Sequence, residues 1–166
     1  MPERITAFGP VAPPGARVLI LGSMPSEASL AMGFYYGHPR NAFWRVLSDI
    51  YEEPLPETVP DKIALLERHD IALWDVLESC RREGSLDSAI REPAVNDFSG
   101  LFGRCPRIGR VLFNGGTACA LFMKHCAGAM DGRQWARLPS TSPAYTLSYE
   151  RKLARWRQAL IDYESM

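Results

Sequence analysis

The chain has 166 residues, 46% of them hydrophobic, which is enough for one sizeable core and predicts a single domain over residues 1–166. The formal net charge is zero, so the overall charge neither favours nor excludes nucleic acid as a partner. No run of 18 apolar residues is present, and the first residues, MPERITAFGPVAPPG, lack the basic and apolar regions of a signal peptide. We therefore expect a cytoplasmic protein without a membrane-spanning helix.

The first predicted strand is followed by a long loop and then a helix. RVLILGS (17–23) is an apolar run ending in glycine, which is typical of a buried parallel strand that turns into a loop. NAFWRVLSDIY (41–51) has apolar residues at helical spacing, and Asn41 is its predicted N-cap. The predicted core positions of this helix are Phe43, Trp44, Leu47, Ile50 and Tyr51.

Strands and helices continue to alternate along the rest of the chain. We expect helices over 60–70, over 97–106 after a loop at 91–100, over 117–127 and over 148–162. We expect strands over 71–77, 108–116 and, leading into a loop, 135–144. This order predicts an α/β fold, a three-layer αβα sandwich with a mainly parallel central sheet of about four strands. In such folds the functional loops follow the carboxyl ends of the strands, here 22–41, 74–82, 114–117 and 138–145.

The charge is distributed unevenly along the chain. Residues 1–100 carry 9 Lys and Arg against 15 Asp and Glu, whereas residues 101–166 carry 10 against 4. The net charge therefore changes from −6 to +6, and the C-terminal third is a candidate surface for a polyanion. The alternative is a solvated helix face, because Arg151 and Lys152 fall on a segment with helical apolar spacing.

The cysteines and histidines do not form the pattern of a metal site. The four cysteines lack C-x-x-C pairing and are widely and irregularly spaced, which favours buried free thiols in a reducing compartment. We expect no metal and no cofactor. The four residues are Cys80, Cys105, Cys119 and Cys126.

The sequence lacks the motifs of serine hydrolases, phosphate-binding loops and dinucleotide-binding folds. No G-x-S-x-G nucleophile elbow is present, and neither GSMPSE nor FNGGTA fits a phosphate-binding loop or a dinucleotide fingerprint. The predicted strand ends offer backbone amides, one loop asparagine, aromatic rings and small polar side chains. Such groups suit a reaction in which a charged transition state is stabilised by fixed dipoles.

Two motifs carry a resemblance to a known family. LILGSMPS…GFYYGHPRNAFWRVL resembles the first motif of the uracil-DNA glycosylase superfamily, and LPSTSPA resembles its second motif, a Pro-Ser loop pressed against DNA. The resemblance covers nearly the whole chain in order. One position departs from the pattern, because Met24 stands where the family usually has a catalytic Asp or Asn. The chain is most similar to the hypoxanthine-DNA glycosylase branch (family 6), which relies on a later asparagine matched here by Asn41.

The resemblance implies roles for the first loop. Asn41 is the implied catalytic residue, which positions a water at the deoxyribose and stabilises positive charge as the glycosidic bond breaks. The loop of Gly22 and Pro25 is expected to approach a flipped base closely. Tyr35 or Tyr36 is the implied ring that stacks on the base, and His38 with Pro39 is expected to fix the entry into the helix. Structural alternatives are a helix cap for Asn41, pocket walls for the tyrosines, and for His38 a structural hydrogen bond in place of proton donation. The implied substrate-binding residues of this loop are Gly22, Ser23, Met24, Pro25, Tyr35, Tyr36 and His38.

Two further substrate-binding residues are expected at later strand ends. Asp75 falls near the position where relatives place a base-reading asparagine, so its carboxylate either accepts from N1–H of hypoxanthine or hydrogen-bonds a loop. Asn114 either reaches the pocket or closes the turn before Gly115.

The second motif and the basic C-terminal third are expected to contact DNA. The hydroxyls and amides of the Pro-Ser loop suit phosphate oxygens, and Tyr145 or Leu147 is a candidate wedge for the vacated base stack. The predicted DNA-binding residues are Pro139, Ser140, Thr141, Ser142, Tyr145, Arg151 and Lys152.

The resemblance as a whole implies a monofunctional DNA glycosylase of base excision repair that hydrolyses the N-glycosidic bond of a deaminated base, hypoxanthine first. Its expected partner is double-stranded DNA with a damaged base, with single-stranded DNA left open, and the protein is expected to act as a monomer. The alternatives are a uracil or mismatch-specific glycosylase and a non-catalytic DNA-binding module on the same fold.

Overall fold

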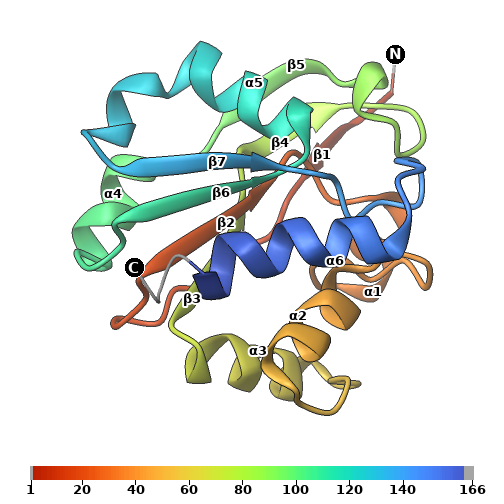
Figure 1. Cartoon of the computed structure of the whole chain (residues 1–166). Coiled ribbons are helices and arrows are strands. Elements are labelled where there is room, and N and C mark those ends of the chain that lie inside the picture. Colours follow the sequence, from red (N-terminus) through yellow and green to blue (C-terminus); the bar gives the residue numbers. More distant parts are fainter. Residues whose placement is uncertain (1, 163–166) are drawn as a thin grey trace.

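The computed structural model describes residues 2–162 and has a four-stranded parallel sheet at its centre (Figure 1). The strand order is β3-β2-β6-β7, and every neighbouring pair is parallel. All five residues of β3 are buried, as expected for a parallel strand covered on both faces. The predicted parallel sheet of about four strands is therefore confirmed. Its strands are β2 (Val18–Gly22), β3 (Ile71–Asp75), β6 (Arg110–Asn114) and β7 (Gln134–Leu138).

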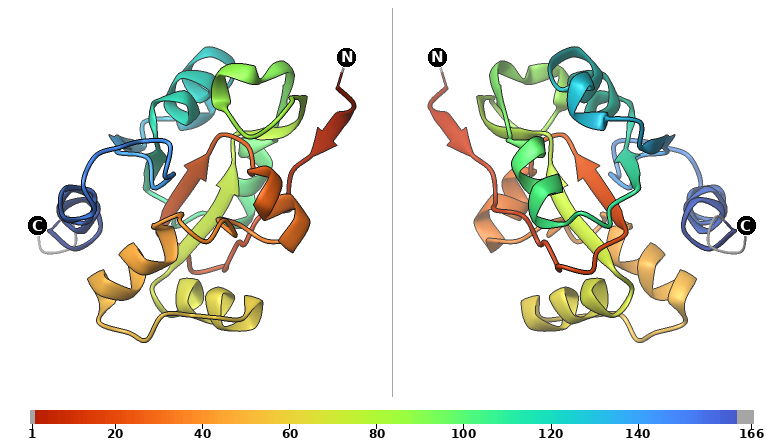
Figure 2. Two further views of the ribbon diagram at one scale, coloured as in Figure 1. Left: turned by 90° about the vertical axis from the view of Figure 1, so that its right-hand side faces the viewer. Right: turned by 90° about the vertical axis from the view of Figure 1, so that its left-hand side faces the viewer.

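Helices cover both faces of this sheet (Figures 1 and 2). On one side lie α2 (Phe43–Tyr51), α3 (Val59–Arg68) and α6 (Tyr149–Arg157), and on the other lie α4 (Phe98–Arg104) and α5 (Gly116–His125). The predicted three-layer arrangement is thus confirmed.

Aromatic side chains fill the two interfaces between helices and sheet. On the side of α4 and α5, the ring of Phe122 contacts those of Phe98 and Phe113 at centroid distances of 5.0 and 5.3 Å. On the other side, Phe43 of α2 meets Trp156 of α6 edge-on at 6.1 Å. These offset and edge-on contacts add to the burial of large apolar surfaces.

A second, antiparallel sheet was not predicted from the sequence. It has the order β1-β4-β5 and consists of β1 (Arg4–Thr6), β4 (Leu77–Arg81) and β5 (Arg91–Val95). The predicted strand over 71–77 ends at Asp75, and the predicted loop over 91–100 contains β5. The apolar run continues through Val76 without a turn residue, so the point where the chain changes sheet leaves no signal in the sequence.

The predicted long loop after β2 contains a short helix, α1 (Glu27–Met32). Its N-cap is Ser26, whose hydroxyl accepts from the backbone N–H of Ser29, and it ends at Gly33 in the left-handed conformation with φ 81°. Six residues are too few for a clear helical period among the glycines and aromatic residues of this segment. Two short 3₁₀ helices, η1 (Asp87–Ala89) and η2 (Ala127–Met130), and the π-helical segment η3 (Gln158–Asp162) after α6 complete the described secondary structure.

The prediction that Asn41 is the N-cap of α2 is wrong by one residue. The cap position is Ala42, and it makes no side-chain capping bond. Asn41 Oδ1 instead accepts from the backbone N–H of Phe43 at 3.0 Å, two residues ahead, as Asn side chains do in tight turns.

The cysteines of the described chain are free thiols, three of them buried. Within residues 2–162 no group of three or more potential metal ligands lies together. No helix in that range combines the length and the apolar character needed to cross a bilayer.

Candidate functional site

A cavity of about 370 Å³ opens where the parallel strands end. Segments that are far apart in the sequence meet there, as expected at the carboxyl edge of a parallel sheet. The predicted site residues that line it are Gly22, Ser23, Met24, Pro25, Tyr35, Tyr36, Asn41, Asp75, Asn114, Ser140, Thr141, Ser142 and Tyr145.

The floor of the cavity is formed by Gly22, Asp75 and Tyr36. A Cβ atom on Gly22 would lie 2.6 Å from Asp75 Oδ1 and 2.9 Å from the Tyr36 hydroxyl, closer than real Cβ contacts. Only glycine therefore lets the carboxylate of β3 and the tyrosine of the following loop approach the end of β2.

Asp75 is a buried carboxyl group, one oxygen of which has no hydrogen-bond partner within the described residues. The residue is 3% exposed, and Oδ2 accepts no hydrogen bond from the described residues. Burial raises the pKa of Asp75 to about 7; the negative charge of Asp87 raises it further, whereas the Arg82 guanidinium opposes the shift. The expected alternative, a side-chain hydrogen bond from Asp75 to a loop, is not seen in residues 2–162.

Tyr36 carries a second buried polar atom without a partner. Its hydroxyl makes no hydrogen bond within the described chain, and its backbone has a φ of 54°, which is rare for a residue with a large side chain. The ring stacks on Phe43 at a centroid distance of 4.2 Å, which fixes its position. Burial raises the pKa of the Tyr36 hydroxyl and outweighs the nearby Asn114 amide, which lowers it without making a hydrogen bond of normal geometry, so the hydroxyl stays protonated and able to donate.

Tyr35 has a different environment although it also lines the cavity. Its hydroxyl donates to the carbonyl of Gly9 at 2.5 Å, and its own carbonyl accepts from the Trp44 indole at 3.0 Å. The residue is 2% exposed. Tyr35 therefore holds the wall of the cavity, and Tyr36 presents the unpaired hydroxyl.

Asn41 lies in the cavity wall, and one of the two polar atoms of its side-chain amide is hydrogen-bonded. Oδ1 accepts from Phe43 N–H, whereas Nδ2 has no partner within residues 2–162. The next residue, Ala42, donates its N–H to the carbonyl of Thr141 at 3.0 Å. The second loop thus fixes the backbone beside Asn41, and the bond from Phe43 N–H fixes its side-chain oxygen.

Asn114 both lines the cavity and holds the second loop. Its amide donates to the Thr141 hydroxyl at 3.0 Å and accepts from the Thr141 N–H at 2.9 Å. Gly115, with φ 100°, lets this loop come close, because a Cβ there would lie 3.2 Å from Ser140 Cβ. Asn114 is therefore a positioning residue, and Thr141 is buried in the loop rather than exposed to phosphates.

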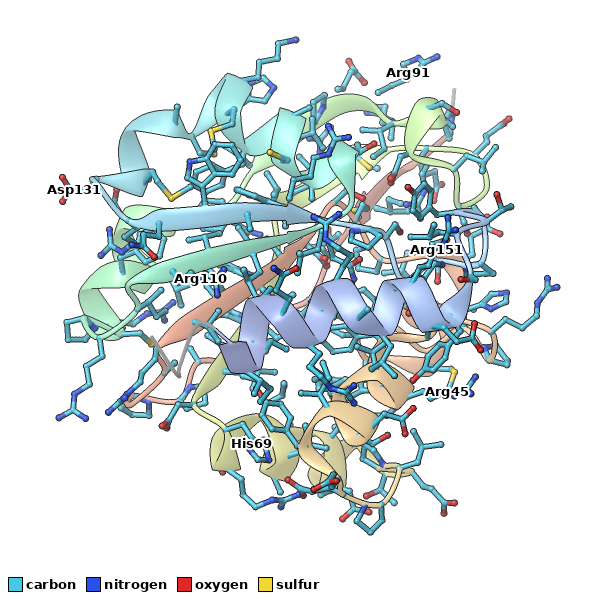
Figure 3. All side chains as sticks on the ribbon, in the orientation of Figure 1. Arg45, His69, Arg91, Arg110, Asp131 and Arg151 are labelled. Carbon is cyan, nitrogen blue, oxygen red and sulfur yellow. The ribbon has the colours of Figure 1, made fainter. Side chains whose placement is uncertain are left out.

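The remaining predicted residues lie outside the cavity wall. His38 Nδ1 accepts from the backbone N–H of Arg40, which is the structural hydrogen bond expected as the alternative role of His38. The Pro139 carbonyl accepts from the Trp156 indole at 2.9 Å. Arg151 is exposed at the start of α6 and is seen on the right of Figure 3.

Lys152 is 5% exposed and does not face solvent. Its Nζ donates to the carbonyl of Ser142 at 3.0 Å, and burial lowers its pKa. The prediction that Lys152 offers its charge to a polyanion is therefore corrected: it ties the second loop to α6.

One wall of the cavity was missed by the sequence reasoning. It consists of Ser85, Leu86, Asp87 and Ser88, in the segment that joins β4 to β5. The available signal was the segment GSLDS, in which small polar residues flank Leu86. It could be interpreted only once the antiparallel sheet was known, because that sheet brings this segment back to β2.

The floor of the cavity is suited to binding a planar ring with polar edges. A reaction on a group attached to that ring would then take place near the mouth of the cavity. The floor offers a carboxylate and a phenol, the wall offers an amide, and the rim offers hydroxyls and the exposed ring of Tyr145. Polar groups without partners in a closed floor are costly unless a ligand pairs with them.

The chain is similar to known proteins both in sequence and in fold. Residues 8–163 match the family profile of the uracil DNA glycosylase superfamily. A hypoxanthine DNA glycosylase from Methanosarcina barkeri (strain Fusaro / DSM 804) is 41% identical over 109 residues, which are 65% of this chain and 69% of that protein. One from Methanosarcina acetivorans is 40% identical over 112 residues, 67% and 71% of the two chains. A solution NMR structure from M. acetivorans, provisionally named a uracil DNA glycosylase, superimposes with a TM-score of 0.84 at 32% identity and covers 98% of this chain and 99% of its own.

Proposed function

Because the chain belongs to the uracil DNA glycosylase superfamily, we propose that it removes hypoxanthine from DNA by hydrolysing the N-glycosidic bond. The product is an abasic site, which base excision repair then processes. The two relatives named as hypoxanthine DNA glycosylases, each about 40% identical, support this substrate.

The observation that carries the proposal is the unpaired carboxylate of Asp75 at the cavity floor. Hypoxanthine has a donor at N1–H and an acceptor at O6. An ionised Asp75 accepts from N1–H, and the Tyr36 hydroxyl, which has no partner in the described chain, donates to O6. Adenine has no hydrogen at N1, so its lone pair faces the carboxylate and the normal base is rejected.

Asn41 acts at the sugar in this proposal. As the C1′–N9 bond breaks, its electron pair leaves with the purine and positive charge develops on the deoxyribose. The amide of Asn41, held by Phe43 N–H and by the neighbouring Ala42–Thr141 bond, orients the attacking water and stabilises that charge. Met24, buried in the same wall, supplies no polar group.

The mouth of the cavity contacts the DNA backbone. Ser140 and Ser142 already accept backbone N–H groups within the loop, and their own hydroxyl hydrogens are directed to phosphate oxygens. Arg151 adds charge at the start of α6, and the ring of Tyr145, 47% exposed, enters the space left by the flipped base.

A panel of duplexes that each contain one modified base tests this function. Purified protein is incubated with hypoxanthine, uracil, xanthine and adenine duplexes, and abasic sites are then cleaved with alkali. We expect product from hypoxanthine above all others and none from adenine. Product from uracil alone would favour the uracil glycosylase alternative, and salt-dependent binding without product from any base would favour the DNA-binding module.

Several expectations stay predictions beside this proposal: one domain over residues 1–166, a monomer, and a cytoplasmic location. Sedimentation of the purified chain checks the monomer, and cell fractionation checks the location.

A further inference from the structure

The segment between β4 and β5 is held against the first loop although the two are far apart in the sequence. The Arg82 guanidinium donates to the carbonyl of Pro25 at 2.6 Å, and the Ser85 hydroxyl accepts from the backbone N–H of Glu27 at 2.9 Å. These contacts fix one wall of the cavity in place, so the side chains on that wall have defined positions.

Asp87 is the charged residue on this wall. Its Oδ1 accepts from the Ser23 hydroxyl at 2.7 Å, whereas Oδ2 accepts no hydrogen bond within residues 2–162. The backbone of Asp87 begins the η1 turn, closed by Ala89 N–H donating to the Leu86 carbonyl at 3.0 Å. A carboxylate with one oxygen bound and the other open is thereby oriented at the cavity.

The two carboxylates that line the cavity differ in depth. Asp75 is buried at the floor, whereas Asp87 is exposed at the rim. The charge of Asp87 contributes to the raised pKa of Asp75. When a base occupies the floor, its sugar lies toward the rim, on the level of Asp87.

We propose that Asp87 is a second catalytic residue of this site, whose carboxylate faces the deoxyribose of the flipped nucleotide. This rests on the proposed function. As the C1′–N9 bond breaks, the electron pair leaves with the purine, and Asp87 stabilises the positive sugar. Water then forms the O–C1′ bond and gives its proton to Asp87, which releases it to solvent; the departing purine takes a proton from solvent.

The electrostatics of the substrate support this assignment. DNA is a polyanion, so a carboxylate at the mouth of its binding site repels the phosphates. The developing cation on the sugar is the part of the substrate that a carboxylate attracts, and fixed charges aimed at such a centre commonly account for 10²–10³-fold in rate. Ser23 is the positioning residue, since its hydroxyl holds Oδ1.

A matched pair of variants separates this role from a structural one. Asp87→Asn keeps an oxygen that accepts from Ser23 but removes the charge, and Asp87→Ala removes both. Asp61→Asn, an exposed residue in the first turn of α3, is the control. Single-turnover release of hypoxanthine is measured with excess enzyme, and binding is measured with a duplex that contains 2′-fluoro-deoxyinosine, which resists cleavage because the fluorine disfavours a positive sugar.

We expect Asp87→Asn and Asp87→Ala to lose about 10²-fold in single-turnover rate, with binding within about twofold of the wild type and Asp61→Asn unchanged. An Asp87→Asn protein at the wild-type rate overturns the proposal, because the hydrogen bond to Ser23 alone would then explain Asp87. So does a loss of rate matched by an equal loss of binding. Should Asp87→Asn melt well below the wild type, Ser23→Ala replaces it: a clear loss of rate at full binding is expected, and an unchanged rate overturns the assignment. A wild type that releases no base from any duplex refutes the proposed function itself.

Discussion

Replacing Asp75 by asparagine is expected to stabilise the protein at pH 8 and to leave its stability nearly unchanged at pH 4. In the folded protein the pKa of Asp75 is about 7, raised by burial from 3.8. Between these two pH values the folded state holds a proton that the unfolded state releases. The free energy of unfolding of the wild type therefore falls as the pH rises from about 4 to about 7.

The size of this effect follows from the two pKa values. A difference of about three pH units at 1.36 kcal/mol each corresponds to about 4 kcal/mol, an upper figure for a group that is 3% exposed. Asparagine carries no charge, so the variant does not have the free-energy cost of ionising a buried carboxyl group. The free energy of unfolding of Asp75→Asn should thus exceed that of the wild type by up to about 4 kcal/mol at pH 8, and the excess should vanish toward pH 4.

Urea unfolding followed by tryptophan fluorescence at several pH values measures this difference. Groups distant from the cavity titrate alike in both proteins, so the difference between the curves reports Asp75 and the charges that interact with it. Asp61→Asn, on the exposed side of α3, serves as the control and should show no such trend. An excess stability that stays constant from pH 5 to pH 8 would refute the reasoning, because Asp75 would then be ionised at the ordinary pH in the fold.

Three further outcomes follow from the site. Asn41→Ala should lower base release by about 10²-fold or more, while the loss of its bond to Phe43 N–H costs about 1 kcal/mol in the free energy of unfolding; normal activity would remove Asn41 from the mechanism. Arg151→Gln should weaken binding to all duplex sequences alike and make the slope of log K against log salt less steep by about 0.9; an unchanged slope would assign Arg151 to a solvated helix face. Met24→Asn should raise the rate on G·U duplexes relative to hypoxanthine duplexes, because a polar group then faces the sugar; an unchanged preference in a folded variant would mean that residue 24 does not act there.

The sequence predicted the parts of the site that follow the parallel strands. Gly22, Asp75 and Asn114 are the last residues of β2, β3 and β6, and the carboxyl ends of parallel strands meet at one edge. Their approximate place therefore follows from strand prediction alone. That Asn114 also holds Thr141, besides lining the cavity, depends on a loop 27 residues later, which no local pattern encodes.

The wall of residues 85–88 and the burial of Lys152 were not predictable in the same way. The wall depends on the antiparallel sheet, in which β1 has only three residues and β5, REPAV, contains a proline and lacks an alternating apolar pattern. Charge counts cannot tell an exposed cation from one that donates to a loop carbonyl, as Lys152 does to Ser142. Likewise, Tyr35 and Tyr36 are adjacent and chemically equal in the sequence, and only the left-handed backbone at Tyr36 separates their roles.

The most direct measurement of the central claim is the identification of the released base. Wild-type protein is incubated with a hypoxanthine duplex, the free base is quantified by mass spectrometry, and abasic sites are counted in the same sample. The account predicts free hypoxanthine and abasic sites in equal amounts, with the strand intact until alkali is added. A sample without free hypoxanthine, or a strand already cut before alkali, would contradict it.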